Sequence, residues 1–323
     1  MEPGYRTREF RDDDWASWSD VRSRSGIPGS RTTADALRSQ TLRLEEGSNL
    51  HRRFVVEETA GHRGVGFALL YREPVDADPA AAWVSAIVDP GHRTRGIGSA
   101  LFDATADAAE RSGVRTLLCR VAVEPPAGTE FLARRGFAER RRSSESVLEL
   151  AEASVLEPGE LARLAAQRGV AVTSWAAASR NDPHAEEKVH ALIQAAGADV
   201  PRVGRSSSLP LDQFRRWVVH NPAVPGEGVF LAMDGAEYVG ISYGNYVEGD
   251  PGAFFQQFTG TRREYRGRGI AGLLKLHLVA FAAQHGVERI RTVNDEENAP
   301  MLAINRTLGF RPSVTWAYLV RSR

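Results

Sequence analysis

Two short glycine-containing segments carry the residue types that bind phosphate groups. Residues 93–98 read Arg-Thr-Arg-Gly-Ile-Gly, and residues 266–271 read Arg-Gly-Arg-Gly-Ile-Ala. Apolar residues at helical spacing follow each segment, so each is expected to lie at the start of a helix. Free backbone N–H groups and the positive end of the helix dipole meet there, glycine lets an anion approach closely, and arginine adds positive charge. The pattern predicts two pyrophosphate-binding loops.

The two loops belong to a longer internal repeat with an offset of 173 residues (266 − 93). The same offset carries Leu101 onto Leu274, Ala109 onto Ala282, Gly113-Val114 onto Gly286-Val287, and Gly136-Phe137 onto Gly309-Phe310. An ungapped register of this length indicates a tandem duplication. The turn-rich stretch after Leu150 predicts a boundary near residue 152, with domains 1–152 and 153–323, and residues 147–150 as the last strand of the first domain. Residues 201–210 are interpreted as a loop inside the second domain.

Hydrophobic periodicity predicts similar elements in the two halves. The first half should contain strands at 53–57, 65–72, 82–88 and 116–123, with a helix at 97–112 closed by Gly113. The second half should contain strands at 229–233, 238–247, 254–261 and 289–293, with a helix at 270–285 closed by Gly286. Strands that lead into a strand–loop–helix–strand unit predict an α/β fold with a mixed sheet.

The loops do not fit the nucleotide triphosphate motif, because the chain has no Gly-x-x-x-x-Gly-Lys-Ser/Thr. Residues 267–272 of the second loop read Gly-Arg-Gly-Ile-Ala-Gly and so match Gly-x-Gly-x-x-Gly, whereas the first loop does not, and this dinucleotide pattern is therefore not what the two loops share. The pattern Arg-x-x-Gly-x-Gly/Ala at a helix start resembles the acetyl-CoA motif of the GNAT superfamily of N-acetyltransferases. Val88-Asp89-Pro90 before the first loop, and the endings Arg135-Gly136-Phe137 and Leu308-Gly309-Phe310, add to this resemblance, which covers both halves.

The resemblance implies two tandem GNAT domains, each with a site for acetyl-CoA. Main-chain groups of one strand in each half should pair with the pantetheine arm, and each loop should wrap the pyrophosphate. Asn298, a good N-cap for the helix after the second central strand, is counted with these residues. The coenzyme-binding residues implied are Ala86, Ile87, Val88, Arg93, Thr94, Arg95, Gly96, Ile97, Gly98 and Ser99 in the first half, and Thr259, Gly260, Thr261, Arg266, Gly267, Arg268, Gly269, Ile270, Ala271, Gly272 and Asn298 in the second.

The two halves differ at the position where many family members carry an acidic tyrosine. Four residues before the glycine of the Gly-Phe pair, this chain has Leu132 and Asn305. Leucine cannot donate a proton, whereas Asn305 could hold pantetheine or polarise the carbonyl. Tyr318 is a substitute acid or a packing residue.

The second half is expected to be the catalytic one. The segment 294–298 (Asn-Asp-Glu-Glu-Asn) is rich in polar groups, whereas its counterpart 121–126 is poorer in them. Glu297 and Asp250 are candidate bases for the amine proton. The first domain would then be a degenerate or structural acetyl-CoA domain.

Composition restricts the partners. Lys+Arg and Asp+Glu each total 41, so no net charge draws the chain to DNA or to an anionic membrane. The single cysteine, Cys119, excludes an intrachain disulfide and is expected to be a buried, inert thiol. The polar N-terminus, the absence of long apolar runs and the lack of metal-ligand histidine spacing predict a cytoplasmic enzyme without membrane anchor or metal.

The predicted activity is transfer of an acetyl group from acetyl-CoA to the amine of a small molecule. A non-catalytic acyl-CoA sensor and a protein (lysine or N-terminal) acetyltransferase are the alternatives. The duplicated domains are expected to pack as an intrachain pseudo-dimer, giving a monomer, or to assemble as a homodimer.

Overall fold

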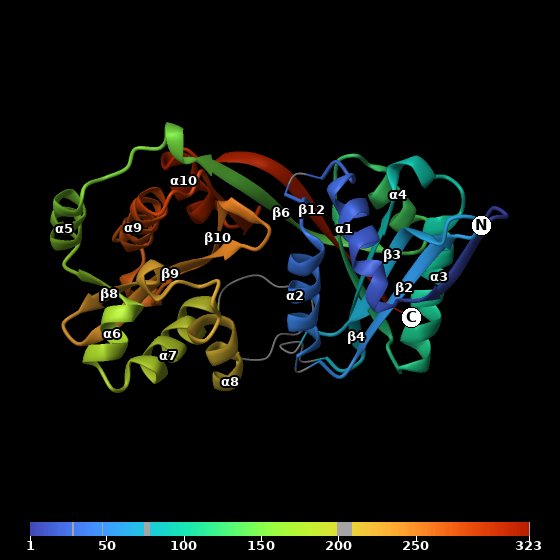
Figure 1. The fold of residues 1–323 in the computed structure, drawn as a ribbon. Coiled ribbons are helices and arrows are strands. Elements are labelled where there is room, and N and C mark those ends of the chain that lie inside the picture. Colours follow the sequence, from blue (N-terminus) through green and yellow to red (C-terminus); the bar gives the residue numbers. More distant parts are fainter. Residues whose placement is uncertain (28, 47, 74–77, 199–208, 323) are drawn as a thin grey trace. The chain divides into compact units, whose positions relative to one another are not determined.

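The computed structural model describes residues 1–27, 29–46, 48–73, 78–198 and 209–322, and these fall into two compact units. The first unit contains the described residues up to Arg142 and those from Val314 onward, and the second contains those from Ser143 to Ser313. The chain trace, coloured from blue to red, shows helices and strands in both units (Figure 1). A single cut at residue 152 does not reproduce this division, because the end of the chain belongs to the first unit. Most of the predicted loop 201–210 lies outside the described residues.

The first unit is a mixed sheet with helices on its two faces. Its described strands have the order β1-β2-β3-β4-β5-β12. Helix α3 covers one face, where Ile97 and Leu101 pack with Val56 and Ala68, and α1 packs on the other. The elements are β1 (Tyr5–Glu9), α1 (Trp15–Ser23), α2 (Ala34–Glu45), β2 (His51–Glu58), β3 (Arg63–Tyr71), β4 (Ala81–Val88), α3 (Ile97–Arg111), β5 (Thr116–Ala122) and α4 (Ala127–Ala133).

The second unit repeats this plan, with two more α-helices among the described residues. Its described strands have the order β6-β11-β10-β9-β8-β7. Helix α9 packs on one face of the sheet and α7 on the other. The elements are β6 (Ala138–Glu149), α5 (Pro158–Gln167), β7 (Ala171–Ser174), α6 (Trp175–Asn181), α7 (Ala185–Gly197), α8 (Leu211–Phe214), β8 (Phe230–Asp234), β9 (Glu237–Val247), β10 (Asp250–Thr261), α9 (Ile270–Gln284), β11 (Arg289–Asp295), α10 (Ala299–Thr307) and β12 (Arg311–Ser322), whose last residues belong to the first unit.

In each unit, the strand that pairs antiparallel with β5 or β11 comes from the other half of the sequence. Residues 143–149 of β6 pair antiparallel with β11, and residues 316–322 of β12 pair antiparallel with β5. The prediction that residues 147–150 close the first domain was therefore wrong. Leu148 pairs with Ile290 of the second unit, and both side chains are buried there. The mixed-sheet α/β prediction and the predicted strand and helix positions are confirmed within a few residues.

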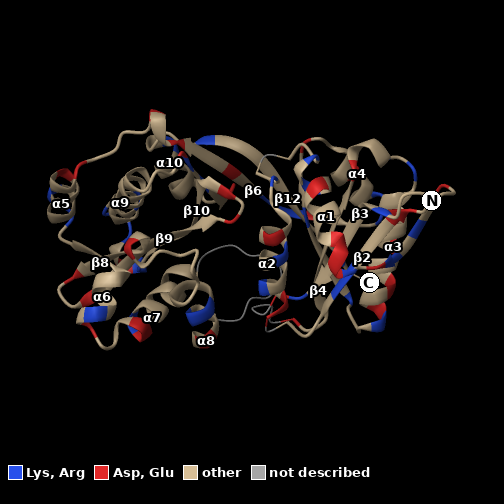
Figure 2. Ribbon diagram, viewed as in Figure 1, with Lys and Arg blue, Asp and Glu red and all other residues tan. Residues whose placement is uncertain are grey.

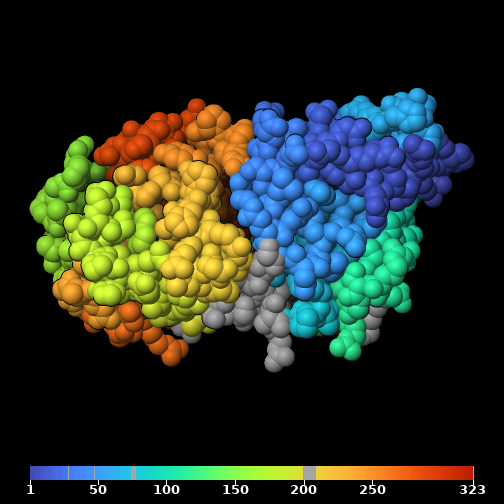
Figure 3. Space-filling view, turned by 60° about the horizontal axis from the view of Figure 1, so that its bottom comes forward, coloured from blue at the N-terminus to red at the C-terminus, as the bar shows by residue number. Residues whose placement is uncertain are grey.

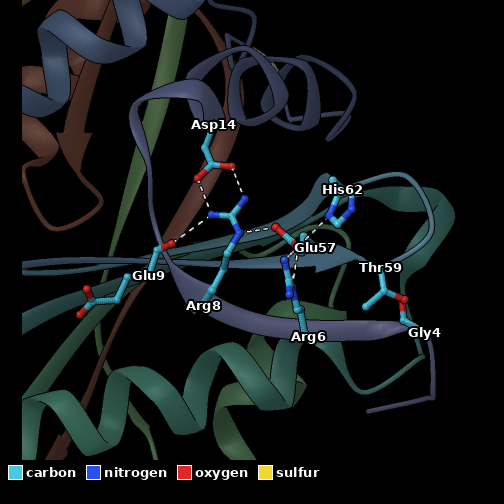
Figure 4. Close-up of polar contacts among 8 residues, drawn as sticks. All are labelled: Gly4, Arg6, Arg8, Glu9, Asp14, Glu57, Thr59 and His62. Atoms are coloured by element: carbon cyan, nitrogen blue, oxygen red, sulfur yellow. Dashed lines mark hydrogen bonds and ion pairs between the residues drawn. The ribbon is translucent and has the colours of Figure 1, made fainter.

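An ion network fastens β1 to β2 and to the turn before α1 in the first unit (Figure 4). The Glu57 side chain is 2 % exposed and accepts hydrogen bonds from Arg6, at 2.6 Å, and from Arg8. Arg8 also donates two hydrogen bonds of 2.7 Å to Asp14. Burial raises the pKa of Glu57, but the hydrogen bonds from Arg8, Arg6 and His62 outweigh it and lower the pKa to about 2. The charged form of Glu57 is thus part of the folded unit.

Charged residues are spread over both units. Basic and acidic residues are both scattered over the ribbons (Figure 2). In the space-filling view, coloured by residue number, the blue N-terminal elements form a continuous part of the surface of the first unit (Figure 3). Cys119 is buried, as predicted, and burial raises its pKa to about 12, so the thiol stays protonated. No helix among the described residues is long and apolar enough to cross a membrane.

Candidate active site

In each unit, two parallel strands pair only near their beginnings and then separate. Residues 81–83 of β4 pair with β5, and residues 253–256 of β10 pair with β11. We call this point of separation the fork. Beyond it, β4 stays paired with β3 as far as Val88, and β10 stays paired with β9 as far as Thr261. The edges of β4 and β10 that face the fork therefore present main-chain groups that pair with no described strand.

The glycine loops follow these strands and adopt the same backbone conformation in the two units. Gly96 and Gly269 are left-handed N-caps with φ of +79° and +75°. Two residues earlier, Thr94 and Gly267 also have positive φ, at +67° and +77°. Helices α3 and α9 begin directly after the N-caps, so their first-turn N–H groups have no intrahelical acceptor. The geometry suits an anion at the start of each helix.

The remaining loop residues take supporting positions. Ile97 and Ile270 are buried and anchor the two helix starts. A Cβ built on Gly98 would lie 3.5 Å from the Phe131 ring and 3.9 Å from Val88 Cγ2, which are ordinary contact distances, in agreement with the alanine at the equivalent position 271. The exposed arginines of the loops point to main-chain or hydroxyl groups nearby, with Arg95 donating to the Tyr5 hydroxyl at 2.9 Å and Arg268 to the Glu264 carbonyl at 3.2 Å.

The two loops differ in what lies over the N-cap glycine. In the first unit it is main chain: a Cβ on Gly96 would lie 2.7 Å from Met1 Cα, and the Glu2 N–H donates to the Arg95 carbonyl at 3.1 Å. In the second unit it is a side chain: Arg168, at the end of α5, donates from Nε to the Gly269 carbonyl at 3.2 Å. A side chain can move aside or turn toward an anion at lower cost than main chain. Arg168 could not be singled out from the repeat in the sequence, because α5 lies outside that repeat.

The strand that leads to the second loop contains a β-bulge at its fork. Gln256 pairs with Gly244 and Phe258 with Tyr243, so Gln257 is an extra residue in β10. A bulge leaves main-chain groups outside the ladder and re-aims the side chains around it. In the first unit, β3 and β4 pair without such a shift from Tyr71 and Trp83 onward.

A buried polar network lies beside this bulge. The Gln256 side chain is held on one side by Lys275 of α9, which donates to Gln256 Oε1. On the other side its Nε2 donates to Thr259 Oγ1 at 2.6 Å and to Ser242 Oγ at 3.1 Å. Lys275 is 2 % exposed, and burial lowers its pKa to about 7.

The first unit has apolar residues at all four positions of this network. Gly66 and Gly240 occupy the same place against α3 and α9, which aligns the two sheets. With that alignment, Ala68, Val84, Ala86 and Phe102 stand where Ser242, Gln256, Thr259 and Lys275 stand in the second unit. The two forks therefore differ in chemistry although they share a backbone plan.

Asp250 and Glu297, the two carboxylates singled out from the sequence, lie in different surroundings. Asp250 is at the closed beginning of β10, about 20 Å of strand before the fork, and Arg289 binds its two oxygens at 2.6 Å. This position does not bring Asp250 to the separating strands. Glu297 is exposed in the turn after β11, and its N–H donates to Asp295 Oδ1 at 2.8 Å.

Helix α10 presents its two asparagines in different ways. Asn298 is the N-cap, as predicted, and accepts a hydrogen bond from the Met301 N–H at 3.3 Å. Asn305 is 2 % exposed and donates to Asn294 Oδ1, at 2.7 Å, on β11. The side-chain oxygen of Asn305, Oδ1, is buried and accepts no hydrogen bond from any described residue.

The exchanged strands change which polar residues reach each fork. Tyr318, considered from the sequence as an acid of the second half, pairs with Arg120 of β5 and belongs to the first unit. Glu145 of β6 instead enters the second unit, where it pairs with Val293, just past the fork. Its side chain is 3 % exposed and lies 2.7 Å from Arg291. No local pattern could have assigned Glu145 to the second half, because it precedes the boundary in the sequence.

A fork between parallel strands, followed by an anion-binding loop and helix, defines a protein class that holds a phosphate-bearing cosubstrate along a strand edge. The Acetyltransferase (GNAT) family model matches residues 9–137 and 191–310. The chain belongs to this family and is an acyltransferase with two GNAT domains in tandem. Among the described residues, no group of three or more side chains could hold a metal ion.

Solved structures with the same fold cover the whole chain. A GCN5-related N-acetyltransferase from Sphaerobacter thermophilus has a TM-score of 0.74 at 15 % identity, over 100 % of this chain and 96 % of the other. A tandem GNAT protein from the clavulanic acid biosynthesis pathway has a TM-score of 0.74 at 21 % identity, over 98 % of both chains. No curated protein sequence matches the chain. These likenesses show the tandem fold and leave the substrate to be inferred.

Proposed function

We propose that the protein transfers an acetyl group from acetyl-CoA to the amine of a small molecule, and that the second unit performs the reaction. The observation that carries this proposal is the second fork itself. It combines a bulged strand, a buried polar network and a loop crossed by a side chain. The first fork has a regular strand, apolar residues at the network positions and a loop crossed by main chain.

The coenzyme fits the second unit by charge and by hydrogen bonding. Its pyrophosphate would lie on the N-terminus of α9. Gly269 has no Cβ to keep the anion away from the backbone, and the positive end of the helix dipole attracts it. Arg268 and Arg168 would add their guanidinium groups. The pantetheine arm would pair with the free edge of β10 at Thr259–Thr261, which brings the thioester to the fork. The bulge at Gln257 supplies main-chain groups there that can stabilise the carbonyl oxygen as it becomes negative.

The amine would approach from the sheet face that carries Glu145. Two carboxylates lie on that face of β6 and β11, Glu145 and Asp295, and both are buried. A carboxylate beside the fork favours a cationic substrate and can accept its proton. The amine nitrogen then attacks the thioester carbon, the C–N bond forms, the C–S bond breaks, and the coenzyme leaves as thiolate.

Asn305 supports this site without acting as the acid. An amide is a hydrogen-bond donor and no proton source at neutral pH. Its bond to Asn294 fixes α10 against β11 beside the fork. We therefore assign Asn305 a positioning role, and the departing thiolate would take its proton from solvent or from the positively charged nitrogen of the tetrahedral intermediate, which leaves a neutral amide as product.

The test is a calorimetric titration with acetyl-CoA, followed by an assay of thiol release with a panel of small amines. The matched variants are Gly269→Ala and Gly96→Ala, because both glycines have the same positive φ at equivalent positions. Circular dichroism checks that each variant is folded. We expect Gly269→Ala to lower thiol release at least tenfold and Gly96→Ala to leave it within twofold.

The other outcomes have distinct meanings. Folded protein that binds no acetyl-CoA would exclude the coenzyme assignment. Binding without thiol release for any amine or peptide would make the protein a sensor of acyl-CoA, and release with peptides alone would make it a protein acetyltransferase. A larger effect of Gly96→Ala would move the active site to the first unit.

A further inference from the structure

The first fork carries a cluster of aromatic and cationic side chains that the acetyl transfer does not use. Trp83 is the last residue of β4 that pairs with β5, opposite Leu118, and Arg120 follows two residues later on β5. Tyr318 pairs with Arg120, and Trp316 lies two residues before it on β12. Because side chains alternate along a strand, all four lie on one face of the sheet. This is the face that α1 covers, since Ile87, four residues after Trp83, packs with the α1 core.

Contacts within the cluster agree with this placement. The Arg120 guanidinium lies 4.2 Å from the centre of the Trp316 ring. The rings of Trp83 and Tyr318 meet edge to face, with centroids 6.3 Å apart. Arg22, in the last turn of α1, has its pKa lowered by burial and by the positive charge of Arg120. The positive charge of Arg120 thus acts on the guanidinium group of Arg22.

Among the described residues, the hydrogen-bond donors of the cluster have no matching acceptors. The indole N–H groups of Trp83 and Trp316 are both buried without a partner among the described residues. Neither Arg22 nor Arg120 forms an ion pair with a described carboxylate. Buried donors and neighbouring like charges are each unfavourable when left alone, so such an arrangement is stabilised when a ligand supplies acceptor oxygens and negative charge.

The equivalent face of the second unit has the opposite character. Aligned by strand pairing, Val293 stands in place of Arg120, and Glu145 in place of Tyr318. The cation there, Arg291, is neutralised by Glu145 at 2.7 Å. The unpaired positive charge is thus a property of the first fork and does not follow from the fold.

We propose that this cluster binds a small organic acid, whose carboxylate is held by Arg22 and Arg120 and whose body lies against Trp83, Trp316 and Tyr318. Guanidinium groups bind carboxylates through two parallel hydrogen bonds, and the aromatic rings offer flat walls to a planar body. Arg120 is exposed and the aromatic side chains are half-buried, so a ligand can reach the cluster from solvent. The first unit would then be a binding domain for an organic anion, independent of acetyl-CoA.

The probe is 4-fluorobenzoate. Its binding to the full chain is measured from the broadening of its fluorine NMR signal at constant ionic strength. 4-Fluorobenzyl alcohol tests the need for charge, and inorganic phosphate as competitor tests whether any oxyanion suffices. The variants are Arg120→Met and Arg22→Met. Arg115→Met is the matched control, because Arg115 is an exposed arginine directly before the same strand.

We expect saturable binding of 4-fluorobenzoate, weakened at least tenfold in Arg120→Met and in Arg22→Met and changed less than twofold in Arg115→Met. The alcohol should bind at least tenfold more weakly, and phosphate should compete poorly. Arg120 is exposed, so its variant keeps the test valid even if Arg22→Met disturbs α1. Absence of saturable binding, equal binding by all variants, or equal binding of the alcohol would overturn the proposal. Strong competition by phosphate would overturn the choice of a carboxylate.

Discussion

Lys275 places a positive charge in the apolar core of the second unit. Its side chain is 2 % exposed, its ammonium group bonds to Gln256 and it lies 4.9 Å from the centre of the Phe310 ring. No described carboxylate neutralises it. The substitution Lys275→Met removes the charge and keeps most of the volume, so it isolates the energetic effect of that charge.

The magnitude follows from the pKa and from the bond that is lost. Burial lowers the pKa of Lys275 from 10.5 to about 7. This difference corresponds to roughly 5 kcal/mol of destabilisation of the charged form below pH 7, at about 1.4 kcal/mol per unit. Methionine leaves the Gln256 carbonyl oxygen without its donor, which costs about 1–3 kcal/mol. We therefore expect Lys275→Met to raise the free energy of unfolding of the second unit by about 2–4 kcal/mol at pH 6.

The pH dependence has a defined sign. The folded-state pKa is lower than the unfolded one, so between pH 7 and pH 10.5 the unfolded chain binds more protons. Residue 275 should therefore make the wild-type protein more stable as pH rises through that window. In Lys275→Met the residue does not titrate, so this contribution to the pH dependence should be absent. The advantage of the variant should shrink above pH 7 and reverse before pH 10.5, when only the lost hydrogen bond remains.

Urea unfolding at pH 6 and pH 9, combined with hydrogen exchange of the α9 amides, measures this difference. Exchange in α9 reports the second unit separately from the first. The control is Lys188→Met, the other lysine of the chain, which is partly exposed and pairs with Asp182 at 2.8 Å. It should change stability by less than about 1 kcal/mol. A Lys275→Met variant that is destabilised equally at both pH values would refute the reasoning, since it would show that the charge is not strained in the folded state.

Three further predictions concern single residues. Thr94→Gly should stabilise the first unit by about 1 kcal/mol, because Thr94 has a φ of +67° and the equivalent Gly267 adopts a positive φ freely. Urea unfolding measures this change in stability, with Gly267→Thr as the reverse variant. A Thr94→Gly variant that is less stable than the wild type would contradict the prediction. Glu57→Gln should destabilise the first unit by about 1–3 kcal/mol at pH 7, with an effect that fades as pH falls from 4.5 toward 2, because the depressed pKa of Glu57 gives stability only while it is charged; equal effects at pH 7 and pH 3 would rule out the ion network as the cause. Glu145→Gln should lower kcat for amines at least tenfold without weakening the binding of acetyl-CoA, with exposed Glu139→Gln of the same strand as control; an unchanged kcat would remove Glu145 from the reaction.

The repeat, the loops and most elements could be predicted from the sequence because their determinants are local. Gly113 and Gly286 end α3 and α9 in the left-handed conformation, both with a φ of +71°, as their positions after an apolar run predicted. The Gly-Phe pairs behave in the same way, since Gly136 and Gly309 have positive φ and the following phenylalanines are buried. Such features depend on φ preferences and on residues a few positions away.

The polar side chains that lie at the two forks could be predicted only in part. The asymmetry of the halves was visible in residues 294–298, yet the network of Lys275, Gln256 and Ser242 was not, because its members come from three separate elements. The extra residue Gln257 that creates the bulge is likewise recognised only when β9 and β10 are paired. A side chain's role here depends on strand register, which a one-residue shift changes completely.

The duplicated α/β plan and the two glycine loops at equivalent positions could be predicted from local sequence. Only the folded units show whether β6 or β12 pairs with a given sheet, and hence that Tyr318 lies beside the first fork and Glu145 beside the second. The physical reason lies in the duplication itself. The equivalent strands β6 and β12 are both 12 residues long, and each can extend either sheet through backbone hydrogen bonds, so their position in the sequence does not identify their partners. The choice depends on the side chains that each strand meets across the sheet.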